Sequence, residues 1–148
     1  MTTIAANLEQ MSADSKVVVG DSHYPAAKIF RFPGMIVGVS GEGRAMGDFL
    51  RWVKEGLPET IPNIEEHQGS FRALVLTPDG LFEYDESFWP EKVNRNFAAI
   101  GTGAHAALAA MMLGQSTENA VAIACQIDNN TGGPVDTLKL AESKRKRK

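Results

Sequence analysis

Short apolar runs with strand-like patterning dominate the first part of the chain. Residues 2–8 (TTIAANL) alternate loosely, and residues 16–19 (KVVV) form a β-branched run that turn residues close. The run 27–32 (AKIFRF) alternates again, and a Pro-Gly turn signal separates it from the buried-looking run 35–41 (MIVGVSG). A turn and a further strand fit within 9–15 (EQMSADS), so the pattern predicts a region made mainly of strands.

The hydrophobic period then changes to that of a helix. Apolar residues recur at helical spacing within 44–56 (RAMGDFLRWVKEG), and a proline-containing loop is predicted at 57–70. The remaining elements are a hairpin at 71–86, a short strand opening 97–104, helices at 104–114 and 116–128, and a strand at 135–140. Because strands and helices are grouped rather than strictly alternating, the order indicates an α+β fold with helices packed on antiparallel sheet.

Composition narrows the class of protein. The 148 residues suffice for one domain with a real core, which we expect over 1–141. No apolar run could span a membrane and the start does not resemble a signal peptide, so we expect a cytoplasmic protein without a membrane partner. The basic tail 142–148, which ends in KRKRK, is expected to be solvated and disordered, although a nucleic-acid-binding module stays open as an alternative. The histidines show no metal-ligand spacing with Cys125, which we expect to pack in the core.

The N-terminus carries the most suggestive chemistry. Removal of Met1 would leave Thr2 with a free α-amine and a hydroxyl on the same residue. An α-amine with an ordinary pKa near 8 retains a neutral fraction at neutral pH, so it can act as the base that activates its own hydroxyl. A nearby lysine would lower the pKa of this amine further.

Six segments, in a fixed order, resemble the proteasome-type N-terminal-nucleophile (Ntn) hydrolases. They are TTIAAN, SADS, AKIFRF, GMIVGVSGEG, FAAIGTGAHAAL and CQIDNNTGGPVDTLKL. The resemblance runs from Thr2 to about Leu140 and is greatest to small bacterial and phage proteasome-like peptidases related to the HslV family. It implies a four-layer α-β-β-α sandwich of antiparallel sheets. A long helix of the family is missing after residue 56, so one helix layer should be reduced.

The resemblance also implies roles for residues in the first half of the chain. Thr2 matches the nucleophile, and Lys28 matches the lysine that tunes its amine. Asp14 matches the aspartate that orients this lysine, with Asp21 as a rival. Gly41 matches the glycine whose backbone N–H stabilises the oxyanion. An exposed strand lysine at Lys28 and an ordinary turn glycine at Gly41 are the alternatives.

Further roles fall in the second half of the chain. Thr102 lies where bacterial members keep a serine that positions the amine, and its alternative is a helix cap. Asp128 and Thr131 match the family's Asp-x-x-Ser-Gly-Gly turn, although Asp128 also reads as a helix-end residue. The backbone carbonyls of Cys125, Asp128 and Thr131 have the spacing with which related peptidases hold a structural monovalent cation. No other cofactor is expected.

The resemblance predicts a threonine peptidase that acts on peptides or unfolded proteins. It further implies a homo-oligomer, either a dimer or a ring, and an AAA+ unfoldase as a possible partner. The alternative from another class is a catalytically inactive scaffold protein that has kept the fold. Processing and reactivity of the N-terminus distinguish the two.

Overall fold

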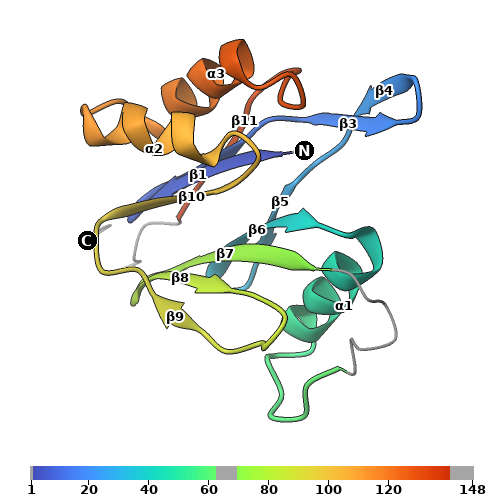
Figure 1. Ribbon diagram of the computed structural model, residues 1–148. Helices are drawn as coiled ribbons and strands as arrows, with labels where there is room; N and C mark the ends of the chain where they lie inside the picture. Colours follow the sequence, from blue (N-terminus) through green and yellow to red (C-terminus); the bar gives the residue numbers. More distant parts are fainter. Residues whose placement is uncertain (1, 63–69, 141–148) are drawn as a thin grey trace.

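A computed structural model describes residues 2–62 and 70–140 of the protein. Its first sheet is antiparallel and has the strand order β10-β1-β2-β11. The strands are β1 (Thr3–Asn7), β2 (Gln10–Ala13), β10 (Phe97–Gly101) and β11 (Asp136–Lys139). Alternation along β1 sends Ile4 and Ala6 to the centre of the molecule and Ala5 to the outer face. Helices α2 (Ala104–Met112) and α3 (Thr117–Ile127) cover that outer face, at the top of Figure 1.

The second sheet is also antiparallel and has the order β5-β6-β7-β8-β9. Its strands are β5 (Ile29–Phe32), β6 (Met35–Gly41), β7 (Phe71–Thr77), β8 (Gly80–Tyr84) and β9 (Glu91–Lys92). Helix α1 (Gly43–Lys54) is capped by Glu42, whose carboxylate accepts from the Arg44 and Ala45 amides. Phe49 and Trp52 of α1 pack with aromatic residues of β7 and β8, so α1 is fixed to the sheet by aromatic contacts.

The two sheets face each other across the main core. Ile4, Met11 and Ile100 from the first sheet pack against Ile36, Leu74 and Leu76 from the second, and all are at least 95% buried. The approach is close at Gly38, where an added Cβ would lie 2.8 Å from the Met11 sulfur. This packing fixes the relative position of β1 and β6, whose ends carry the predicted site residues.

A separate hairpin projects from this body. Strands β3 (Lys16–Val19) and β4 (Ser22–Pro25) pair only with each other among the described strands, and β4 is exposed throughout. Figure 1 shows the hairpin extending beyond the start of β1. It leaves β2 directly after Asp14, so its first residues remain close to the predicted site.

The α+β prediction is confirmed, and the predicted helices and most predicted strands are present. Strands β4 and β9 were not predicted, because β4 is exposed along its whole length and β9 has only two residues. The predicted loop at 57–70 is without helix or strand at 57–62, while 63–69 and the predicted tail lie outside the described residues. None of the helices described here is long and apolar enough to cross a membrane.

Candidate active site

A buried ion pair joins two of the charged residues predicted for the site. The Lys28 ammonium lies 3.0 Å from each oxygen of the Asp14 carboxylate and 2.6 Å from the Lys16 carbonyl oxygen. Asp14 is fully buried and Lys28 is 6% exposed, so Lys28 is not the exposed strand lysine of the alternative reading. The rival Asp21 is exposed in the β3–β4 turn. The structure therefore brings Lys28 to Asp14.

The same carboxylate is bound to the start of the chain. Asp14 Oδ1 accepts the backbone N–H of Thr3 at 2.9 Å, and the Thr3 carbonyl accepts the Asp14 amide at 3.1 Å. Asp14 Oδ2 accepts the Gly132 amide at 3.1 Å. The peptide group between Thr2 and Thr3 is thus attached through one side chain to the Lys28 ammonium.

Two glycines make room for the N-terminal residues. Gly101 has φ +98°, and a Cβ there would lie 1.9 Å from the Thr2 carbonyl oxygen. A Cβ at Gly103 would lie 2.0 Å from the Thr3 hydroxyl, and the Gly103 amide donates to the Thr2 carbonyl at 3.4 Å. Thr2 itself is 8% exposed. Both positions therefore need glycine for β1 to pass this close to the loop before α2.

Two threonine hydroxyls bind Asp128, and a third joins the network through Thr131. Its Oδ2 accepts from Thr102 at 2.5 Å and from Thr131 at 2.6 Å, and the Thr131 and Thr3 hydroxyls lie 2.7 Å apart. Since a carboxylate can only accept, Thr131 gives its proton to Asp128, and Thr3 must then donate to Thr131. The network gives each hydroxyl proton a fixed direction.

Asp128 is the charged end of this network. Burial alone raises the pKa of Asp128, but hydrogen bonds from Thr102, Thr131 and the Asn130 amide outweigh it and hold the pKa below its usual value. Asp128 is also the C-cap of α3, as the alternative reading had it. Thr102 does not cap α2, whose N-cap is Gly103.

Gly41 lies across a cavity from this network. It ends β6 with φ +136°, and a Cβ there would lie 2.4 Å from the Ser70 carbonyl oxygen. A cavity of about 390 Å³ is lined by Gly41 together with Gly101 and Thr102. The cavity therefore opens where the two sheets bring together the Gly41 backbone and the residues around Thr2.

The turn after α3 offers the predicted monovalent cation the right type of ligand atom, namely backbone carbonyl oxygen. Cys125 lies in the last turn of α3, where helix carbonyls lack partners within the helix, and carbonyl oxygen is a hard ligand. The Asp128 carbonyl already accepts the Thr131 amide at 3.1 Å, which leaves it one lone pair. Burial raises the pKa of the half-buried Cys125 thiol, which disfavours a thiolate nucleophile. The described residues contain no cluster of His, Cys, Asp and Glu that could hold a metal ion.

Sequence reasoning missed several residues of the site. The strand predicted over residues 2–8 gives Thr3 no role, yet its side chain is fully buried and hydrogen bonded to Thr131. A polar residue in phase with Ala5, on the face of β1 that α2 and α3 cover, is the signal that could have found it. The Lys16 carbonyl carries no such signal, because a backbone acceptor does not depend on the residue type.

The fold is shared with solved structures of HslV and related proteins. The eukaryotic HslV of Trypanosoma brucei superposes with a TM-score of 0.71 at 18% identity, covering 95% of this chain and 99% of that one. A Thiobacillus denitrificans BPH in complex with epoxomicin superposes with a TM-score of 0.68 at 18% identity over 95% and 99% of the two chains.

A third solved structure shares the fold at lower identity. The Anbu (Gly-1) mutant from Hyphomicrobium sp. strain MC1 gives a TM-score of 0.70 at 14% identity, over 94% of this chain and 81% of that one. No protein-family model matches the sequence, and no curated protein matches it. The likeness therefore lies in the fold, and activity has to be argued from the site.

Proposed function

We propose that this protein is a threonine peptidase of proteasome type, whose nucleophile is the Thr2 hydroxyl after removal of Met1. The observation that carries the proposal is the buried Lys28–Asp14 pair, bound directly to the Thr3 amide. A buried pair is costly to desolvate and is weak evidence for a purely stabilising role. Its attachment one residue from the proposed nucleophile supports a role in chemistry.

The first half of the reaction forms an ester. The α-amine of Thr2 takes the proton of its own hydroxyl, and Oγ1 attacks the substrate carbonyl to give a tetrahedral oxyanion. The fixed Lys28 ammonium stabilises the developing alkoxide, and the Gly41 N–H donates to the oxyanion. Collapse breaks the C–N bond, the amine proton passes to the leaving nitrogen, and an acyl ester of Thr2 remains.

The second half hydrolyses this ester. The neutral Thr2 amine takes a proton from water, hydroxide adds to the ester carbonyl, and Oγ1 leaves with the proton that the amine returns. Thr102 gives its own proton to Asp128, so a lone pair of its hydroxyl is available to accept from the amine. Asp128 and Thr131 act through Thr102 and Thr3 and are positioning residues.

Several features accompany this proposal. Helices outside both facing sheets support the four-layer α-β-β-α arrangement, and α1 is the one described helix on the second sheet, as a reduced layer requires. The fold supports assembly into a dimer or ring that takes peptides or unfolded proteins, with an AAA+ unfoldase as a possible partner. A monovalent cation on the carbonyls of Cys125, Asp128 and Thr131 would brace the turn after α3.

Intact mass tests the function before and after incubation with epoxomicin or a β-lactone. We expect loss of Met1 and one adduct, which disappears in Thr2→Ala but persists in Thr60→Ala, a change at an exposed loop threonine. Tandem mass spectrometry should place the adduct on Thr2. A retained Met1 without an adduct would refute the peptidase and favour the inactive scaffold.

A further inference from the structure

β10 presents one free edge in the described part of the chain. It is the outer strand of its sheet and pairs only with β1. An edge strand offers a row of backbone N–H and C=O groups to any other extended chain. Which residues of β10 carry those groups follows from the register.

The hydrogen bonds of β1 fix the register. Both backbone groups of Thr3 bind Asp14, on the β2 side of β1. Successive residues of a strand point their backbone groups to opposite edges, so Ile4 and Ala6 face β10. Their partners Ile100 and Ala98 therefore face β1.

The remaining three residues of β10 face outward. By the same alternation, the N–H and C=O groups of Phe97, Ala99 and Gly101 point to the free edge. Gly101 is the residue that lies against the Thr2 carbonyl. The free edge thus begins at the candidate active site.

Two neighbouring cavities follow this edge. The cavity at the active site is lined by Gly101 and Thr102, and a second cavity of about 360 Å³ is lined by Ala98 and Ala99. Arg72 lines the first and Glu83 lines the second, and these two side chains form an ion pair at 3.5 Å. The two cavities are therefore neighbours along β10, and we call them together the groove.

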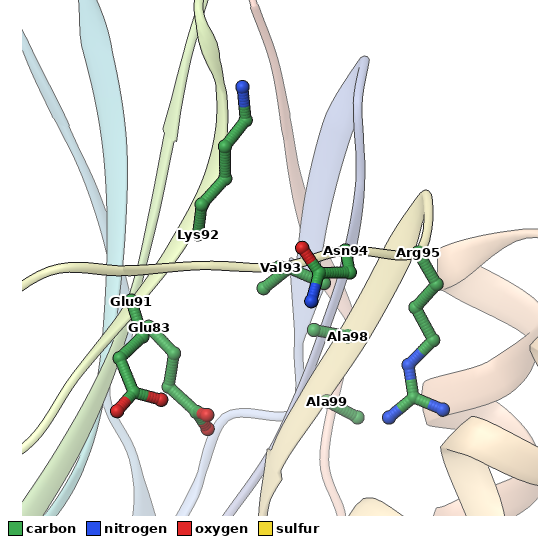
Figure 2. Close-up of a pocket in the computed structure, with 8 residues that line it drawn as sticks. All are labelled: Glu83, Glu91, Lys92, Val93, Asn94, Arg95, Ala98 and Ala99. Atoms are coloured by element: carbon green, nitrogen blue, oxygen red, sulfur yellow. The ribbon is translucent and has the colours of Figure 1, made fainter.

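The far wall of the groove is polar. Figure 2 shows the carboxylates of Glu83 and Glu91 on one side of the second cavity and Ala98 and Ala99 of β10 on the other. Lys92 points away from them. Such a wall gives little apolar anchoring, so an occupant would be held mainly by its own main chain. The five residues of β10 span about 17 Å, enough for an extended segment of about five residues.

We propose that the free edge of β10 binds an extended segment of the polypeptide substrate, which continues from the carbonyl attacked by Thr2. The segment adds as a strand to the first sheet and exchanges main-chain hydrogen bonds with Phe97, Ala99 and Gly101. This inference rests on the proposed function. A polypeptide fits better than a small molecule because the exposed donors and acceptors repeat at the spacing of a strand.

The test uses Ala99→Pro, which removes one outward N–H while leaving the pairing with β1 intact, as proline is tolerated on strand edges. Ala99→Ser keeps the N–H and is the matched control. Cleavage of denatured casein by the wild-type protein first identifies a cleaved sequence, and a labelled peptide of about ten residues with that sequence is the long probe. The short probe is a fluorogenic amide that does not reach the groove. We expect KM for the long peptide to rise about tenfold in Ala99→Pro only. The KM for the short amide, which does not reach the groove, should rise far less than the KM for the long peptide.

A substrate-side scan keeps the test independent of how the variant folds. Peptides N-methylated at single positions should bind wild-type protein more weakly at alternate residues, and Ala99→Pro should be insensitive at one of them. Unchanged KM in Ala99→Pro together with a flat N-methyl scan would overturn the proposal. So would a change in oligomeric mass without a change in KM, since the edge would then join copies of the chain.

Failure of the peptidase function is recognised separately. It would show as no adduct and no cleavage by the wild-type protein. Fluorescence anisotropy of the labelled peptide then still tests whether the free edge of β10 binds a polypeptide. Equal affinities of wild-type protein and Ala99→Pro would overturn it.

Discussion

The buried Lys28–Asp14 pair leads to a quantitative prediction. Lys28→Met removes the ammonium but keeps most of the stem, and it leaves a fully buried carboxylate without its counter-charge. Asp14→Asn removes the charge of the other partner. It also replaces one carboxylate oxygen by an NH₂ group, which cannot accept the hydrogen bonds that the Thr3 amide and the Lys28 ammonium donate. Breaking a buried pair from one side costs about 3–5 kcal/mol of the free energy of unfolding.

Urea unfolding followed by tryptophan fluorescence measures this loss. With a slope of about 2 kcal/mol per molar urea, each single variant should lower the midpoint by about 1.5–2.5 M. The double variant should lose less than the sum of the two, with a coupling of about 1–3 kcal/mol, because each single change strands the other charge. Single losses below about 1 kcal/mol, or strictly additive losses, would refute the reasoning.

An exposed ion pair gives the matched control. Arg51 pairs with Asp48 at 3.2 Å on the surface of α1, and the Arg51 side chain is 69% exposed. Arg51→Met should change the free energy of unfolding by less than about 1 kcal/mol. If it cost as much as Lys28→Met, the loss could not be assigned to burial.

Three further predictions concern the N-terminal strand and its hydroxyl network. Gly103→Ala should lower stability in a urea titration and abolish the Thr2 adduct, because its Cβ would overlap the Thr3 hydroxyl. The control Gly47→Ala, whose Cβ would lie in open space within α1, should be neutral or slightly stabilising. Thr3→Val should slow adduct formation and Thr3→Ser should restore it, since the fixed donor to Thr131 is lost in one and kept in the other. Burial raises the pKa of Asp128, but hydrogen bonds from neighbouring groups lower it by more, so the net pKa is below its usual value. The ionised form therefore adds stability, and this stability is lost as pH falls through the lowered pKa. Wild-type protein should therefore lose thermal stability more steeply below about pH 4 than Asp128→Asn, and equal slopes would contradict this.

Much of the fold could be predicted because its elements carry strong local patterns. The hairpin of β7 and β8 alternates around a Pro-Asp-Gly turn, and α1 shows a clear helical period. Strand β4 could not be predicted in this way, since its four exposed residues have no buried face and its pairing with β3 defines it. The hydrophobic pattern reports burial, so it fails where a strand is made by backbone pairing alone.

The site shows the same division between side-chain and backbone information. Asp14 and Asp21 both follow short strand-like runs, and the sequence left them as rivals for Lys28. Only the packing of the sheets brings one of them to the ammonium. The acceptor from Lys16 and the space at Gly101 belong to the backbone, and local sequence does not specify them.

The network around Asp128 links stability and the proposed chemistry in one set of contacts. Two threonine protons point at a single carboxylate oxygen, so ionisation of Asp128 determines the direction of every hydroxyl up to Thr3. Protonation of Asp128 would release those directions, including the lone pair that Thr102 offers to the Thr2 amine. In wild-type protein the adduct rate, which protonation of the Thr2 amine already lowers at higher pH, should therefore show a second acid step over the range in which stability is lost. In Asp128→Asn the adduct rate should be low and lack that acid step, because its amide cannot ionise.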